Sequence, residues 1–193
     1  MELDLKTTYV TSDLHFFHKN IIKYCNRPYE QNQEGIDKMN EDLLQEIDRL
    51  PPGSLLINNG DIEMGCSDFD KIYKLVQRMK ENDKKVWIIM GNHDRSLKRF
   101  VKSGEMKFES SQELLEFAGF DLVTPAPILI NDKFIFSHEP IRISGDFINV
   151  HGHTHDKDPD WESLDNPPQD HYYNVCWDKL HKIVTLGDII KSF

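Results

Sequence analysis

Five short runs of apolar and β-branched residues in this chain each stop at a small cluster of polar residues. Each run has the length and composition of a buried β-strand. In α/β proteins the loops that leave the carboxyl ends of the strands gather at one edge of the sheet, where ligands bind. We therefore expect five clusters that are distant in sequence to meet in one crevice: residues 11–15, 59–61, 91–94, 137–138 and 151–155.

Strand and helix patterns alternate in the first half of the chain, which predicts an α/β fold. Strands are expected over 8–11, 54–57 and 86–90, and apolar residues at helical spacing predict helices over 36–50 and 68–82. In the second half, Asn131-Asp132 separates the strand patterns 128–130 and 134–136, which predicts a hairpin and a second, more antiparallel region. Further strand patterns cover 147–150, 172–175 and 182–185, and a loop is expected over 156–170. We predict one layered α/β domain spanning residues 1–193.

Composition and charge exclude several classes of function. The longest apolar runs are far too short to cross a bilayer, and the N-terminus lacks the basic and apolar zones of a secretory signal, so a cytoplasmic protein is expected. Three scattered cysteines argue against a disulfide scaffold or a thiolate zinc site. A net charge of −10 disfavours general binding to nucleic acids. No oligomeric state is predicted.

The five clusters together contain the side chains of a metal centre. A lone Asp or His after a strand is more often a turn former or a helix cap, but carboxylates, an amide and imidazoles at five strand ends are difficult to explain as turns. Pairs two residues apart would point to one side of an extended backbone, and Gly60, Gly91 and Gly152 precede polar residues where a Cβ would be in the way. The candidate ligands are Asp13, His15, Asp61, Asn92, His138, His153 and His155.

These clusters resemble the five motifs of the calcineurin-like metallophosphoesterases: Asp-x-His, Gly-Asp, Gly-Asn-His-Asp/Glu, His and Gly-His-x-His. The stretch 13–22 with Arg27-Pro28-Tyr29 is similar to a small bacterial and phage branch of that family. The resemblance implies a four-layer α/β/β/α sandwich with the active site at the carboxyl ends of the strands. It also implies two metal ions that share Asp61, one bound by Asp13, His15, Asp61 and His155, the other by Asp61, Asn92, His138 and His153.

The resemblance implies hydrolysis of phosphate esters. A water that bridges the metals would be the nucleophile, and His93, oriented by Asp94, would be the acid. The alternative is a purely structural role, in which His93 and Asp94 form a hydrogen-bonded pair that stabilises the loop. Ligands of this kind suit manganese, iron, cobalt, nickel or zinc, with manganese favoured. The expected substrate is a small phosphodiester or phosphomonoester, most plausibly nucleotide-like.

Two other functions stay open, a phosphoprotein phosphatase and an inactive binding scaffold of the same fold. Several residues near the motifs receive no catalytic assignment. Glu63 has no clear counterpart in the family's second motif. His18 and His151 flank the motifs and could touch substrate or support a metal ligand, but structural hydrogen bonds explain them equally well. Arg27 and Arg142 could each bind a phosphate or a carboxylate through two N–H groups, but surface ion pairs are the expectation for both.

Overall fold

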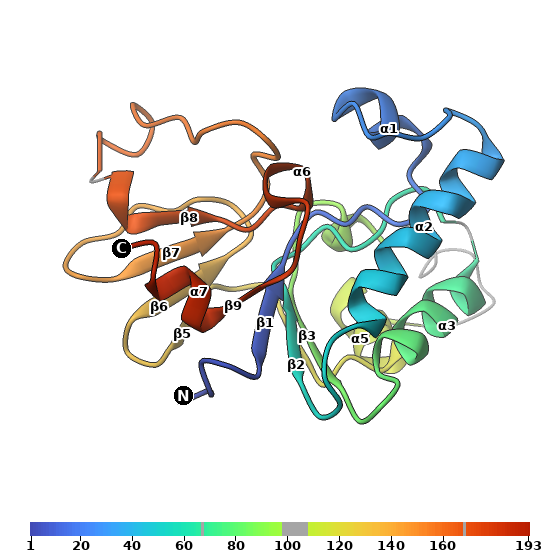
Figure 1. Ribbon diagram of the computed structural model, residues 1–193, viewed down its shortest axis with the longest axis horizontal. Coiled ribbons are helices and arrows are strands. Elements are labelled where there is room, and N and C mark those ends of the chain that lie inside the picture. Colours follow the sequence, from blue (N-terminus) through green and yellow to red (C-terminus); the bar gives the residue numbers. More distant parts are fainter. Residues whose placement is uncertain (67, 98–107, 168) are drawn as a thin grey trace.

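The computed structural model describes residues 1–66, 68–97, 108–167 and 169–193, which form two β-sheets (Figure 1). The first sheet has the order β4-β3-β2-β1-β9, and only β9 runs antiparallel to its neighbour. The second has the order β5-β6-β7-β8. The strands are β1 (Thr8–Thr11), β2 (Leu55–Asn58), β3 (Lys85–Ile89), β4 (Leu122–Thr124), β5 (Ile128–Ile130), β6 (Phe134–Ser137), β7 (Ile148–His151), β8 (Tyr172–Asn174) and β9 (Val184–Thr185).

In both sheets the strand pairing aligns the carboxyl ends of neighbouring parallel strands, the ends from which the predicted polar clusters leave. In the first sheet Thr11 pairs with Asn58, which in turn pairs with Ile88. In the second sheet Ser137 pairs with His151, which pairs with Asn174. The loops that leave β1, β2, β3, β6 and β7 therefore start at common levels.

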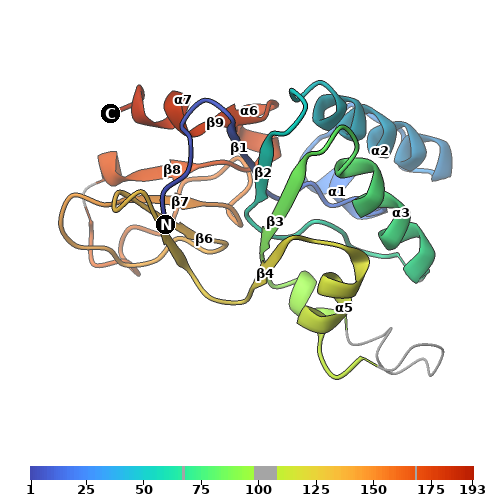
Figure 2. The same ribbon diagram turned by 90° about the horizontal axis from the view of Figure 1, so that it is seen from below.

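Helices cover one face of the first sheet, and the second sheet lies on the other side (Figure 2). The long helix α2 begins after Asn32, whose side chain accepts a hydrogen bond from the amide of Gly35. The helices are α1 (Lys19–Tyr24), α2 (Gln33–Asp48), α3 (Phe69–Met79), α5 (Ser111–Ala118), α6 (Trp177–Leu180) and α7 (Leu186–Ile190), with 3₁₀ turns at Asp94–Ser96 and Gln169–His171.

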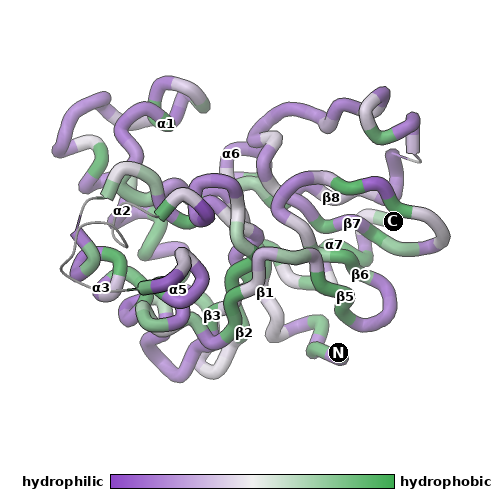
Figure 3. Tube along the Cα trace, turned by 180° about the vertical axis from the view of Figure 1, so that it is seen from behind, coloured by the Kyte–Doolittle hydropathy of each residue, from purple (hydrophilic) through white to green (hydrophobic). Residues whose placement is uncertain are grey.

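Two hydrophobic clusters divide the core, because neighbouring strand residues point to opposite faces of a sheet. On β2, Leu56 packs with the helices α2, α3 and α5, whereas Ile57 packs toward the second sheet. Figure 3 shows hydrophobic residues along the strands and hydrophilic residues along many connecting loops. The α/β sandwich is confirmed. The helices after the second sheet are short, and α7 packs against β9 and β1.

The second sheet differs from its prediction in one respect. The hairpin at Asn131 and Asp132 is confirmed, with φ values of 55° and 45° that suit a two-residue turn. Only β5 and β6 pair antiparallel, however, because β6, β7 and β8 run parallel to one another. Residues 156–167 contain turns without a helix or strand, and residue 168 of the predicted loop lies outside the described residues. No helix among the described residues is long and apolar enough to cross a membrane.

Candidate metal centre

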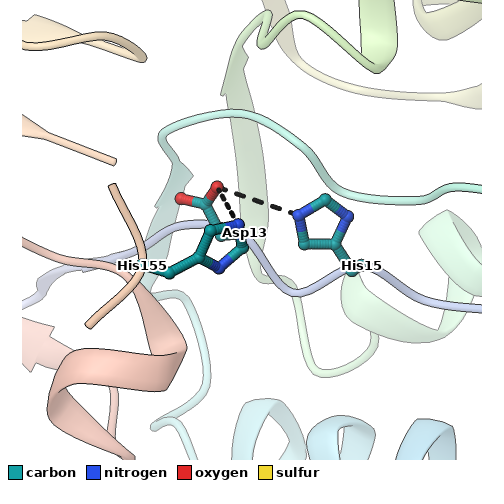
Figure 4. Close-up of side chains that lie close together, drawn as sticks. All are labelled: Asp13, His15 and His155. Carbon is teal, nitrogen blue, oxygen red and sulfur yellow. Dashed lines mark ion pairs between the residues drawn. The ribbon is translucent and has the colours of Figure 1, made fainter. Parts of the chain in front are cut away.

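The first half of the site forms around Asp13, directly after β1. His15 Nε2 lies 3.9 Å from Asp13 Oδ1 and 3.8 Å from Asp61 Oδ2. His155, which arrives from the loop after β7, places its Nε2 4.0 Å from the same Asp13 Oδ1. Figure 4 shows both imidazoles near the Asp13 carboxylate, with a ring nitrogen of each joined by a dashed line to the same oxygen. Asp13, His15 and His155 therefore offer three atoms close enough to bind one cation.

The second half forms around Asn92, in the loop after β3. His138 Nε2 and His153 Nδ1 each lie 3.1 Å from Asn92 Oδ1, and 3.3 Å from each other. His138 Nε2 is also 3.5 Å from Asp61 Oδ2. The Asp61 carboxylate therefore lies between the two halves, close to His15 on one side and His138 on the other.

Several buried atoms of the first half have no hydrogen-bond partner among the described residues. They are Asp13 Oδ1 and both ring nitrogens of His15. Such groups are expensive to bury unpaired, and a divalent cation would give Asp13 Oδ1 and a His15 nitrogen the partner that they lack. Burial lowers the pKa of His15 to about 3, so its imidazole is neutral at neutral pH, as a metal ligand must be. At His138 and His155 neighbouring carboxylates outweigh burial and raise the pKa to about 9 and about 10, so a metal ion would have to displace a proton from these two rings. The donor set therefore fits a metal ion.

Five of the seven candidate ligands have a left-handed backbone. The φ values are 56° at Asp13, 52° at His15, 53° at Asp61, 69° at His153 and 53° at His155. A non-glycine residue in this region costs roughly 1–2 kcal/mol, and such strain is concentrated at functional sites. The prediction that the two-apart pairs sit on extended backbone is therefore wrong, because each ligand in them lies on a sharp turn.

The glycines of the motifs allow the close approach of these turns. A Cβ on Gly91 would lie 2.1 Å from Asp61 Oδ1, and one on Gly152 would lie 2.1 Å from Ser12 Oγ. Gly60 has a φ of +102°, and its Cβ would lie 2.5 Å from His138 Nδ1. The prediction that a side chain would be in the way is confirmed at all three positions.

His93 and Asp94 do not form the contact expected of them. Both oxygens of Asp94 accept hydrogen bonds from backbone amides, those of Asp61, Ile62 and Gly91. The Nε2 of His93 lies instead 3.8 Å from Asp61 Oδ2, and its side chain is 30% exposed. Asp94 therefore stabilises the loop. The His93 ring points toward the site without a contact to Asp94, and its nitrogen lies close enough to His15 and Asp61 to bind the same cation.

A cavity of about 510 Å³ opens over the cluster and extends toward α1 and residues 154–158. His93, His15 and His155 form part of its lining, together with the exposed Tyr24. His18 also lines it, and burial together with the nearby His93 lowers the pKa of His18 to about 4. His18 is therefore close to the metal centre, although no motif identified it.

The two arginines left out of the site have different surroundings. Arg142 forms an exposed ion pair with Asp165, as predicted. The prediction of a surface ion pair is wrong for Arg27, whose buried guanidinium donates to both carboxylate oxygens of Asp178. Asp178 also accepts a hydrogen bond from His155 at 2.8 Å. It has no counterpart in the five motifs, and no local pattern marked it.

Two further residues near the motifs, His151 and Glu63, are buried. The His151 ring lies against Tyr172, and its Nδ1 is 2.9 Å from the carbonyl of Gly152. The Glu63 carboxylate accepts a hydrogen bond from the amide of Cys66. These contacts stabilise the loops that follow β2 and β7.

Comparison with known proteins gives similar chains and one family. The uncharacterized protein MJ1445 of Methanocaldococcus jannaschii is 24% identical in an alignment of 203 residues that covers 98% of this chain and 98% of that one. The crystal structure of AQ665 from Aquifex aeolicus, a protein of unknown function, superposes with a TM-score of 0.62 at 19% identity, over 96% of this chain and 98% of that one. The crystal structure of nuclease MPE from Pseudomonas putida gives a TM-score of 0.47 at 19% identity, and the superposition covers 78% of this chain and 61% of that one. The family model described as calcineurin-like phosphoesterase matches residues 6–188, so the chain belongs to the calcineurin-like phosphoesterases.

Proposed function

We propose that this protein is a metal-dependent hydrolase of phosphate esters. The observation that carries the proposal is the convergence of buried, unpaired ligand atoms at the base of an open cavity. Asp13 Oδ1 and His15 Nε2 have no hydrogen-bond partner among the described residues, and Asp61 Oδ2 lies 3.8 Å from that nitrogen. Membership of a family of metal-dependent phosphoesterases supports the same reaction.

Two divalent ions would be held by the two halves of the site, with Asp61 shared between them. The first would use Asp13, His15, Asp61 and His155, and the second Asp61, Asn92, His138 and His153. Bound divalent ions polarise phosphoryl oxygens and generate a nucleophile from water at neutral pH. We favour manganese among the metals that such ligands suit.

His93 is the residue proposed to donate a proton to the leaving oxygen. Its side chain is partly exposed in the cavity, and its ring centre lies 5.3 Å from that of His15. A proton donor must be able to reach the substrate as well as lie beside the centre. Asp94 is not required to orient the His93 ring, because its oxygens bind the loop backbone.

The proposed substrate is a small phosphodiester or phosphomonoester of nucleotide-like size. The cavity of about 510 Å³ lies within the usual range of small-molecule sites. Tyr24, which is 71% exposed, and the apolar Met64 line it beside the candidate ligands and provide surface for an organic leaving group. The net charge of −10 opposes the binding of long polyanions.

The test is a substrate screen of metal-stripped protein reconstituted separately with manganese, iron, cobalt, nickel and zinc. We expect turnover of bis-p-nitrophenyl phosphate or p-nitrophenyl phosphate, and of at least one cyclic nucleotide, nucleoside monophosphate, dinucleotide or small sugar phosphate. Faster turnover of a phosphopeptide panel would indicate a phosphoprotein phosphatase instead. Absence of hydrolysis with all five metals would overturn the proposal in favour of a binding scaffold.

His93→Ala tests the acid within the same screen. We expect this variant to keep both metals and to lose turnover by roughly two to four orders of magnitude, the usual range for a lost general acid. His171→Ala, in the 3₁₀ turn Gln169–His171, is the matched control and should behave as wild type. Metal analysis that shows fewer bound ions in His93→Ala would make His93 a ligand and overturn its role as the acid.

A further inference from the structure

Residues 176–178, at the start of α6, reach the metal centre from outside the five motifs. Asp178 accepts a hydrogen bond at Oδ2 from His155 Nδ1, with the two atoms 2.8 Å apart. Its side chain is only 1% exposed, so water competes little for this contact. A carboxylate that accepts from one ring nitrogen fixes the histidine tautomer and leaves the other nitrogen free to bind a metal. For His155 the free nitrogen is Nε2, the atom that faces Asp13 Oδ1.

Cys176 acts in the same way on a different ligand. Its Sγ lies 3.0 Å from Asp13 Oδ2, and the amide of His153 donates to that same oxygen at 2.9 Å. Both Cys176 and Asp13 are completely buried. These two contacts occupy Oδ2 and leave Oδ1 as the oxygen that faces His15 and His155.

Arg27 holds this arrangement together. It donates to Asp178 Oδ1 at 2.7 Å and to Asp178 Oδ2 at 3.0 Å. The same guanidinium donates to the backbone carbonyls of Asp13 and Leu14, at 2.8 Å each. Arg27 thereby connects the turn that carries Asp13 with the carboxylate that orients His155.

The same contacts argue against a separate metal site at Cys25, His155 and Asp178, whose potential ligand atoms also lie close together. Both oxygens of Asp178 already accept from Arg27, and His155 Nδ1 is already paired with Asp178. A cation placed there would have to displace a buried guanidinium and would meet its positive charge.

We propose that Cys176, Asp178 and Arg27 are positioning residues for the Asp13/His15/Asp61/His155 half of the centre and determine its metal affinity. Cys176 selects the oxygen that Asp13 presents, Asp178 selects the nitrogen that His155 presents, and Arg27 fixes Asp178 relative to Asp13. The other half contains Asn92, His138 and His153, and among the described residues none of these three side chains forms a hydrogen bond with Cys176 or Asp178. The inference rests on the proposed function in so far as the centre binds metal ions.

Binding of Mn²⁺, followed by the electron paramagnetic resonance signal of the free ion, tests the proposal without reference to activity. In Asp178→Ala we expect one Mn²⁺ site to weaken by about 10- to 100-fold, the usual effect of losing such a hydrogen-bond partner, while the other keeps its affinity. Asp178→Asn can still accept from His155 and should lose less. Asp165→Ala, which removes an exposed carboxylate, is the matched control and should bind as wild type.

Cys176→Ser and Cys176→Ala separate a hydrogen bond from a packing effect. Both substitutions remove the sulfur, but only serine can still donate to Asp13 Oδ2. We expect Cys176→Ala to weaken the same Mn²⁺ site and Cys176→Ser to restore most of its affinity. This pair keeps the proposal testable if Asp178→Ala fails to fold, which thermal unfolding of the metal-free variants would reveal.

Three outcomes would overturn these assignments. Wild-type affinity at both Mn²⁺ sites in Asp178→Asn, Asp178→Ala and Cys176→Ala refutes the positioning role. Equal weakening in Cys176→Ser and Cys176→Ala shows that the thiol acts by packing, which removes Cys176 from the set. If the wild-type protein binds no Mn²⁺, iron, cobalt, nickel or zinc, the proposed function itself fails, and the inference fails with it.

Discussion

Replacement of Asp94 by alanine distinguishes a structural carboxylate from a catalytic one. Asp94 is completely buried, and its oxygens lie 2.7 Å from the amide nitrogen of Asp61, 2.8 Å from that of Gly91 and 3.1 Å from that of Ile62. In Asp94→Ala these three amides would be buried without an acceptor. The expected consequence is a loss of stability in the metal-free protein, before any catalytic step is considered.

The contacts set the size of that loss. A buried donor without a partner costs about 1–3 kcal/mol, so three amides give roughly 3–9 kcal/mol. The substitution also removes an unfavourable contribution, which offsets part of this loss. Burial and the neighbouring Asp61 raise the pKa of Asp94, so its ionised form is itself costly to bury. We therefore expect about 3 kcal/mol, near the lower end, which corresponds to a decrease in Tm of roughly 6–12 °C for a protein of this size.

Urea unfolding of metal-free protein at pH 7.5 measures this loss directly. Asp94→Asn keeps the shape and one acceptor oxygen but places an amide donor against backbone N–H groups, so its loss should be intermediate. Asp165→Ala, an exposed carboxylate, should unfold like wild type. The reasoning would be refuted by an Asp94→Ala variant with wild-type stability and strongly reduced turnover, because Asp94 would then act through His93.

Two further predictions concern a motif glycine and a surface ion pair. Gly152→Ala should abolish binding of at least one Mn²⁺, because its Cβ would lie 2.1 Å from Ser12 Oγ and 2.5 Å from Asp13 Oδ2; full Mn²⁺ stoichiometry by metal analysis would contradict this. Hydrogen bonds from Arg78 lower the pKa of Glu41 from 4.5 to about 2, so its contribution is present above pH 4.5 and lost as the pH falls toward 2. Because the Glu41 side chain is 46% exposed, the stability difference between wild type and Glu41→Gln should be below ~1 kcal/mol at neutral pH. This difference should shrink as the pH falls from 4.5 toward 2. A difference in urea unfolding that does not change with pH would count against the ion pair.

The sequence predicted the parts of the fold and site that depend on local pattern. Apolar runs of four or five residues identified β1, β2 and β3, and the polar residues that follow them do converge, as the distances around Asp61 show. The motif glycines were correctly interpreted, since a Cβ at Gly91 would overlap the Asp61 carboxylate. These features are readable because each one is set within a few residues of chain.

The remaining features depend on contacts between distant parts of the chain. Asp178 is 23 residues from His155 and 151 residues from Arg27, and an isolated Asp at the start of a short helix carries no signal of either contact. The same limit made Arg27 look like a surface residue. It also allowed an extended backbone to be assigned to Asp13 and His15, which have positive φ values and whose amides donate to the carbonyls of Gly60 and Asp61 in the loop after β2.

The position of the site between the two sheets explains why so much of it is long-range. Asp13, Asp61 and Asn92 follow strands of the first sheet, whereas the candidate histidines at 138, 153 and 155 follow strands of the second. Asn59 joins the two, because its buried amide donates to the carbonyls of Ser137 and Val150. A metal ion held by ligands from both sheets would be a second link of the same kind, and it would stabilise the packed state by its differential affinity for that state over the unfolded chain. Metal binding and sheet packing are then two aspects of one equilibrium, so a residue such as Asp178, which orients a ligand from the second sheet and is itself fixed by Arg27, contributes to both.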